Sequence, residues 1–262
     1  MGTGVVKDRV KELSYYFFFG LMVLAKGLGL DSGNRLYYLL SIIACICVGC
    51  KLVLTKYNYR QLGAITLLCV IAFAAYRNSG RLGIILTVLA VIGLKDMDIR
   101  KLFRLGLAVY GCAFALTVLM AKTGIRTNPL DVHVKGGTEV IRWGMGYSTG
   151  NIFHISYFIL TVFFCYTWEK RYGIKRFLLL MAGNFIVFLF SLSYTGIIVT
   201  AFYLLLNLYA VKRKRLCMAE RVICQIPLPL CLIFSFAAPF LLNNPFVEKL
   251  NSMMQARLAF SF

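Results

Sequence analysis

Nine apolar runs divide this sequence, and their length constrains the fold more than any other feature. A helix needs about 20 mostly apolar residues, within a range of about 17–25, to cross the hydrocarbon core of a bilayer. Because 60% of the residues are hydrophobic and only 15% are charged, a soluble fold could not bury this much apolar surface. The sequence therefore predicts an all-α, polytopic integral membrane protein with about nine transmembrane helices in one domain, residues 1–262. The runs lie near 13–29, 36–54, 61–76, 81–94, 102–121, 151–168, 177–191, 194–211 and 222–243.

The positive charges indicate an orientation. The net charge is +19, but the basic residues form short clusters between apolar runs, such as KRKR at 212–215, which is a pattern of membrane topology. No nucleic-acid partner is therefore expected. With the N-terminus in the cytoplasm and all nine runs crossing, 19 of the 29 Lys and Arg residues lie inside and 10 lie outside. This bias predicts a bacterial plasma (inner) membrane protein, N-terminus cytoplasmic and C-terminus outside, with membrane lipids as partners.

Two polar segments on the predicted outer side carry basic residues against this bias. The first is the outer loop 122–150, which includes Lys135 and Arg142, and the second is the C-terminal segment 244–262, which includes Arg257. The stretch IRWGMGYSTGNIFH, residues 141–154, has two interpretations at this point. Either Arg142 anchors a helix end among lipid headgroups beside a glycine turn, or it forms one wall of a site for an anionic substrate, since guanidinium groups suit phosphate oxygens.

The remaining polar residues exclude several classes of chemistry. All ten acidic residues lie in loops or at the ends of runs, which disfavours an ion-coupled carrier, because such carriers need carboxylates within the membrane. The sequence contains no HExxH, P-loop or GxSxG motif, so neither a metal nor another cofactor is expected. Within the runs, Asn184, Asn207 and Ser191 are expected to form hydrogen bonds between helices. His154 shares a helix face with Asn151, and both a structural and a catalytic role remain open for it.

The order and spacing of three motifs resemble a known family. Arg142, Gly146, Tyr147 and Asn151 follow the pattern of an arginine, a Gly-aromatic pair and an asparagine that opens a span. SLSYTG at 191–196 and LNSMMQARL at 250–258 resemble two later motifs of the same family. The family comprises bacterial O-antigen and capsular polysaccharide polymerases (Wzy-like) and O-antigen ligases. This chain has Thr149 and Gly150 where members often carry His-Pro, and Tyr194 where they carry arginine.

The resemblance implies a fold and a reaction. The fold would be a helical glycosyltransferase arrangement of the GT-C type, and the chain would be C-terminally shortened, because members are usually longer. The donor would be an undecaprenyl-pyrophosphate-linked oligosaccharide at the outer face, used without a cofactor. An acceptor hydroxyl would attack the anomeric carbon, and polyprenyl pyrophosphate would leave. Other components of polysaccharide export would be possible partners.

The same resemblance implies roles for single residues. Arg142 and Arg257 would stabilise the pyrophosphate charge as the catalytic pair. Substrate binding would involve Gly146, Tyr147, Asn151, His154 and Lys135. Asn151 would alternatively cap the sixth span. The general base is left open among Asp131, Glu139, His154 and Glu248.

Two other functional classes compete with this one. The first is a flippase for lipid-linked glycans or another multi-span exporter, in which the basic outer loop forms a substrate vestibule. The second is a membrane scaffold without chemistry. Within the enzyme class, the sequence leaves polymerase and ligase as equal alternatives.

Overall fold

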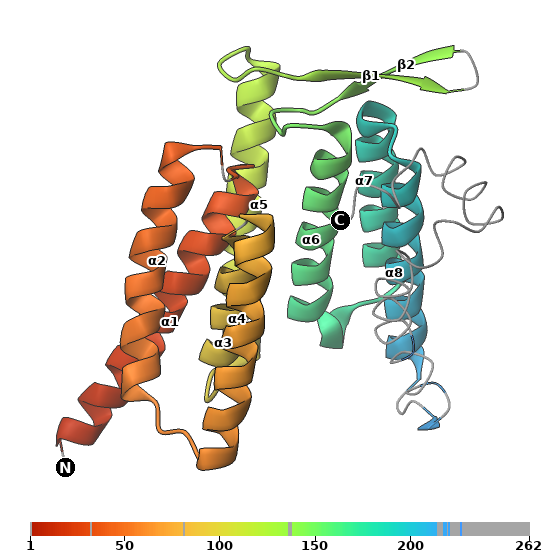
Figure 1. Cartoon of the computed structure of the whole chain (residues 1–262). Coiled ribbons are helices and arrows are strands. Elements are labelled where there is room, and N and C mark those ends of the chain that lie inside the picture. Colours follow the sequence, from red (N-terminus) through yellow and green to blue (C-terminus); the bar gives the residue numbers. More distant parts are fainter. Residues whose placement is uncertain are drawn as a thin grey trace, which may run out of the picture. The chain divides into compact units, whose positions relative to one another are not determined.

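The computed structural model describes residues 2–31, 33–80, 82–135 and 138–213, together with 217, 218, 220 and 226. The chain divides into two units, 1–211 and 212–262, and the arrangement below is that of the first unit. Helices α1 to α5 precede a β-hairpin, and α6 to α8 follow it (Figure 1). The elements are α1 (Gly2–Gly27), α2 (Arg35–Leu54), α3 (Tyr59–Ser79), α4 (Gly83–Gly93), α5 (Ile99–Lys122), β1 (Leu130–Lys135), β2 (Thr138–Trp143), α6 (Gly150–Thr167), the 3₁₀ helix η1 (Glu169–Arg171), α7 (Ile174–Ser191) and α8 (Tyr194–Lys212).

Six of the described helices are long and apolar enough to cross a membrane. They are α2, α3, α5, α6, α7 and residues 194–211 of α8. Helix α4 has only 11 residues, which is about 17 Å of helix against about 30 Å of hydrocarbon. The prediction of a helical, multi-pass membrane protein is confirmed at this level. The ninth run, 222–243, and the segment 244–262 lie outside the described residues.

Exposed apolar side chains cover the outer faces of these helices. Ile46 of α2 is 62% exposed, Val70 of α3 is 60% exposed and Phe202 of α8 is 62% exposed. Surface of this kind is unfavourable in water but is solvated by lipid tails, which are as apolar as the side chains. The outer faces therefore agree with a membrane-embedded protein.

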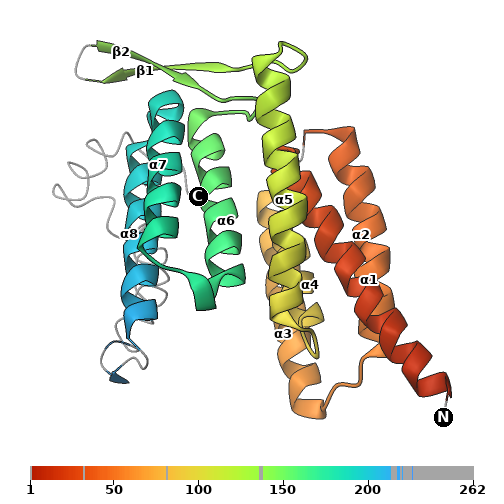
Figure 2. The same ribbon diagram turned by 180° about the vertical axis from the view of Figure 1, so that it is seen from behind.

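Aromatic and small side chains form the contacts between helices. Tyr15 and Phe18 of α1 pack with Val48 of α2 and Leu102 of α5. Farther along α5, a Cβ atom on Gly106 would lie 2.7 Å from the Phe163 ring of α6, so the missing side chain lets these two helices approach closely. Helix α1 thus packs on α2 and α5, α5 packs on α6, and α6 packs on α7 (Figures 1 and 2).

Polar side chains fix several helix boundaries. Asn34 accepts a hydrogen bond of 2.9 Å from the backbone N–H of Leu36 at the start of α2. Asp98 caps α5 in the same way, with bonds to two backbone N–H groups. Helix α3 begins at a reciprocal capping box between Asn58 and Gln61. Such caps satisfy N–H groups that have no partner within the helix.

The segment 122–150, predicted as a loop, contains a two-stranded antiparallel hairpin. Strands β1 and β2 pair in a register that places Asp131 opposite Arg142 and Val132 opposite Ile141. The signal was present in the sequence. Polar and apolar residues alternate in LDVHVK, and Gly136-Gly137 separates the two strands, which is a hairpin pattern. The described residues are otherwise mostly helical, which is consistent with the predicted all-α membrane protein.

Candidate functional site

The elements of the first unit meet at two ends, defined by contacts between their loops. We call the first the hairpin end, which comprises the ends of α1, α5 and α7, the starts of α6 and α8, and the hairpin. We call the second the basic end, which comprises the start of α1, the connections 55–58 and 94–98, and residues 168–173. Figure 1 shows the hairpin lying across the ends of α5, α6 and α7.

A tight turn over residues 144–147 joins the hairpin to α6. Tyr147 N–H donates to Gly144 O over 2.9 Å, and the two central residues, Met145 and Gly146, have φ of 46° and 84°. Both angles are positive, as in the turns that favour glycine. A Cβ atom at Gly146 would lie 2.9 Å from the carbonyl oxygen of Thr117. Gly146, predicted to bind substrate, therefore lets the turn pack against α5.

Tyr147 is fully buried and holds the turn against α1. Its hydroxyl donates a hydrogen bond of 2.7 Å to Gly27 O at the end of α1, and its ring packs against Phe114 and Phe153. Because the hydroxyl and the ring are both used within the protein, the geometry favours a structural role over the predicted contact with substrate. The positive charge of Arg126 is used similarly, since its Nη1 donates to Leu28 O over 2.6 Å.

Arg142 differs from these residues because it is buried and two of its three guanidinium nitrogens have no hydrogen-bond partner among the described residues. Its side chain is 2% exposed, and neither Nε nor Nη1 has a hydrogen-bond partner among the described residues. An arginine that anchors a helix at lipid headgroups extends its charged end outward, which is incompatible with this burial. Removing an ion from water costs several kcal/mol unless another group compensates. The site therefore presents a buried guanidinium whose Nε and Nη1 have no hydrogen-bond partner among the described residues.

Arg142 lies where the first two family-like motifs come together. A Cβ atom on Gly150, the first residue of α6, would lie 3.3 Å from Arg142 Cβ and 2.8 Å from Ser191 O. A Cβ atom on Gly196 would collide with the His154 ring. Residues 142–154 thus contact residues 191–196 directly, although about 40 residues of sequence and a pair of helices separate them. Glycine at 150 and at 196 makes this approach possible.

Two helices begin beside Arg142. Thr149 caps α6, with its hydroxyl accepting from Ile152 N–H over 3.3 Å, and Ser193 Oγ accepts from Gly196 N–H in the first turn of α8. The alternative prediction that Asn151 caps α6 is therefore wrong, because the cap lies two residues earlier. The backbone N–H groups at a helix start carry partial positive charge and attract anions. They reinforce the field of Arg142.

His154 forms a closed network beneath these helix starts. Its Nδ1 lies 2.9 Å from Ser191 Oγ and its Nε2 lies 2.8 Å from Asn184 Oδ1. Asn184 Nδ2 donates to Ile197 O over 3.1 Å, which fixes the amide orientation and requires Nε2 of His154 to carry a proton. Both ring nitrogens are occupied and the side chain is fully buried. The geometry favours the structural interpretation of His154.

The expected hydrogen bonds between helices are found for two of the three polar residues, Asn184, Ser191 and Asn207. Asn184 and Ser191 connect α7 to α6 and α8 through this network. Asn207 instead donates to Tyr203 O, one turn earlier in its own helix.

The other predicted residues occupy different positions. Asn151 lies in the first turn of α6 and is partly exposed. Lys135 ends β1, and its side chain is not among those described. Arg257, with Glu248, lies outside the described residues. The structure therefore brings Arg142, Asn151 and His154 to one end of α6, and it assigns Gly146 and Tyr147 to the adjoining turn.

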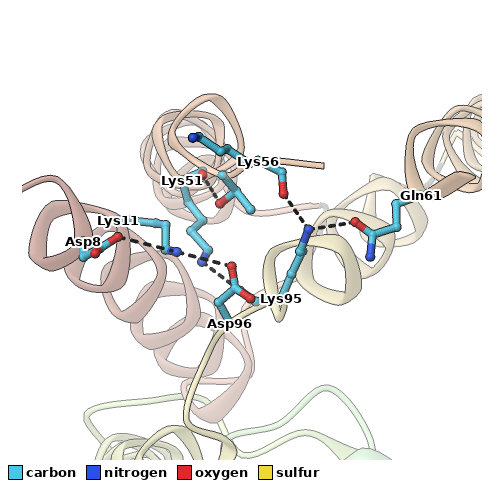
Figure 3. Close-up of polar contacts among 8 residues, drawn as sticks. Asp8, Lys11, Lys51, Lys56, Gln61, Lys95 and Asp96 are labelled. Atoms are coloured by element: carbon cyan, nitrogen blue, oxygen red, sulfur yellow. Dashed lines mark hydrogen bonds and ion pairs between the residues drawn. The ribbon is translucent and has the colours of Figure 1, made fainter. Parts of the chain in front are cut away.

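The basic end contains a second polar cluster that the sequence did not single out. Lys51 is fully buried and donates from Nζ to Lys95 O over 2.8 Å. Asp96 accepts from Lys11 Nζ over 3.3 Å, and Lys95 Nζ donates to Gln61 (Figure 3). These bonds join α1, α2, α3 and the connection before α5. The three lysines of this cluster each donate to an acceptor within the protein, so it stabilises the helix ends.

One carboxylate at the same end is also neutralised internally. Tyr16 donates a hydrogen bond of 2.8 Å to Glu12, and Lys101 Nζ lies 3.5 Å from the same carboxylate. The tyrosine bond and the lysine charge lower the pKa of Glu12. Neither Glu12 nor Tyr16 is available for catalysis at the hairpin end.

The comparisons with known proteins identify no relative. No protein-family model, curated protein or solved structure matches this chain.

Proposed function

We propose that this protein is a membrane glycosyltransferase that polymerises or ligates oligosaccharide units carried on a polyprenyl pyrophosphate. The observation that carries the proposal is the buried guanidinium of Arg142, which has no partner on Nε or Nη1 among the described residues. A pyrophosphate would supply the missing acceptors and the compensating charge. The contact between residues 142–154 and 191–196 supports the same reading, since both stretches resemble motifs of one family.

The proposed chemistry requires stabilisation of a leaving group. As the acceptor hydroxyl attacks the anomeric carbon, the glycosidic bond to phosphate breaks and negative charge accumulates on the pyrophosphate. Arg142 and the starts of α6 and α8 provide fixed positive charge at this place, which is most effective where water is excluded. Arg257 remains the proposed second arginine. Among the candidates for the general base, Asp131 lies opposite Arg142 in the register of the hairpin.

A reconstituted reaction tests the proposal. Purified protein in detergent is mixed with lipid-linked repeat units, with or without a separate acceptor glycan. Longer glycans indicate a polymerase, and transfer to the acceptor indicates a ligase. An exporter forms neither product, because export requires two compartments.

Substitution of Arg142 gives the sharper result. Arg142→Ala should lower product formation by about 100-fold or more, the loss seen when one preorganised charge-stabilising group is removed. Arg142→Lys should recover little of it, because lysine lacks the paired donors. Lys122→Ala, which removes an exposed charge from the end of α5, is the matched control and should retain full activity. Product ladders that survive in Arg142→Ala contradict the assignment.

Stability separates a functional charge from a structural one. If Arg142 served the fold, Arg142→Met would destabilise the protein. Since Nε and Nη1 lack partners, we expect Arg142→Met to leave the melting temperature in detergent unchanged or to raise it, because the cost of burying the charge disappears. A large decrease in melting temperature would show that the guanidinium supports the fold.

A further inference from the structure

The basic end contains a cavity that the proposed reaction does not use. It has a volume of about 290 Å³ and lies between the start of α5, the end of α6 and η1. We call it the basic cavity, and its lining residues include Arg100, Arg104, Thr167, Trp168 and Arg171. Helix α6 has 18 residues, so about 27 Å of helix separates this cavity from Arg142. The two sites are therefore distinct.

The charges around the basic cavity are mostly uncompensated. Lys170 and Glu169 also line it, which gives four cationic side chains and one carboxylate. Arg100 Nη2 lies 3.9 Å from Glu169 Oε2, and both side chains are largely exposed, so this ion pair is weak. Among the described residues, Arg104, Lys170 and Arg171 form no ion pair. The cavity therefore attracts anions.

The wall of the basic cavity that contains Trp168 and Thr167 is suited to a fixed position at the membrane surface. Trp168 closes α6, and the guanidinium of Arg176 lies 4.9 Å from the centre of its ring, which holds the indole in place. Arg176 also donates to Arg171 O and thereby ties η1 to α7. Thr167 has a buried hydroxyl without a partner among the described residues, which leaves a further polar group in the wall.

The geometry points to the basic cavity as a binding site for a phosphate group, with an anionic phospholipid headgroup as its favoured source. The spanning segments of α5 and α6 meet the water phase here, and tryptophan and tyrosine prefer this depth. Basic recesses between transmembrane helices recognise anionic headgroups, and arginine matches the phosphate oxygens. The volume lies at the lower limit of small-molecule sites, about 300 Å³, which fits a headgroup rather than a whole lipid. Lipid bound here would fix the connection between α6 and α7.

Fluorescence of Trp168 provides the assay. The chain has two tryptophans, so Trp143→Phe leaves Trp168 as the only indole reporter. The Trp143→Phe variant is purified in a zwitterionic detergent. It is titrated with phosphatidylglycerol, with phosphatidylcholine and with inorganic phosphate in separate experiments. We expect a saturable change in emission with phosphatidylglycerol and none with phosphatidylcholine.

Matched variants test whether the basic cavity is responsible. Arg104→Ala with Arg171→Ala should weaken phosphatidylglycerol binding by about tenfold or more, the effect of losing a hydrogen bond to a charged group. Arg104→Lys should retain part of it. Lys7→Ala with Arg9→Ala removes two exposed charges at the same end outside the cavity and should change binding little. Melting temperatures confirm that each variant is folded.

The outcomes separate the possible sources of phosphate. If inorganic phosphate saturates and phosphatidylglycerol does not, and if the Arg104 and Arg171 double variant loses this response, the same cavity would be assigned to a free anion. Equal weakening in both double variants would show that only the general surface charge attracts lipid and would overturn the proposal. Identical responses to phosphatidylglycerol and phosphatidylcholine would overturn it as well.

Discussion

Close approach at single glycines brings the site at the hairpin end together. Gly150 allows Arg142 and Ser191 to approach the first residue of α6, and Gly196 allows the His154 ring to lie against α8. At each of these two positions the structure has no room for a side chain. The positions are therefore packing requirements of the site, although neither residue carries a functional group.

Gly196→Ala tests this packing requirement. The added methyl group must displace the His154 ring, so we expect the variant to lose about 1–3 kcal/mol of stability, as overpacked interiors do. Gly49→Ala is the matched control, because a Cβ atom there meets nothing within 4 Å and alanine favours helix by about 1 kcal/mol. Thermal unfolding in detergent should show a lower melting temperature for Gly196→Ala only. Equal shifts would contradict the packing argument.

At the scale of elements, the turn after the hairpin is joined to α1 across more than 100 residues of sequence. Tyr147 reaches Gly27 O and Arg126 reaches Leu28 O, so two donors from the segment 122–150 satisfy carbonyl groups at the end of α1. The basic residues of this segment thus have different uses. Arg126 caps a helix, whereas Arg142 has no such bond on Nε or Nη1.

Tyr147→Phe tests the connection. The substitution retains the ring but leaves Gly27 O with only the long bond of 3.4 Å from Thr117, so we expect a loss of about 1 kcal/mol. Tyr59→Phe removes a hydroxyl from a side chain that is 91% exposed and should be neutral. Denaturation of the purified variants measures the difference. A Tyr147→Phe variant as stable as wild type would show that the hydrogen bond contributes little.

Sequence and structure agree best where a pattern is local. The apolar runs predicted the six long helices because membrane thickness sets their length. The apolar runs do not predict the hairpin, because its alternation covers only six residues per strand within a polar segment. The contact between residues 142–154 and 191–196 depends on how α6, α7 and α8 pack. Periodicity does not encode that packing, so the sequence alone did not predict a contact between the two stretches. The burial of Arg142 follows from the same packing.

At the scale of the molecule, the two ends differ in their charge. Lys11, Lys51, Lys95 and Arg100 come from separate elements, and their contacts place them at the basic end. The segments that the charge count assigns to one side of the membrane therefore lie together. We propose that this side is cytoplasmic, in accordance with the excess of lysine and arginine.

Reporter fusions test this orientation. An alkaline phosphatase fused after Asn128 should be active, because this residue precedes the hairpin on the proposed outer side. A fluorescent protein fused after Arg171 should fold and fluoresce, because η1 lies on the proposed inner side. The exchanged fusions serve as controls and should be inactive. The reverse pattern at both sites would invert the topology.

The buried guanidinium of Arg142, whose Nε and Nη1 have no partner in the part of the chain that the structure describes, also couples occupancy to conformational stability. Any anion that binds the folded protein at Arg142, and does not bind the unfolded chain, shifts the folding equilibrium by mass action. The protein should then be hardest to denature when its site is filled and easiest after exhaustive removal of anions. The composition of the purification buffer thus becomes part of the energetics of this fold.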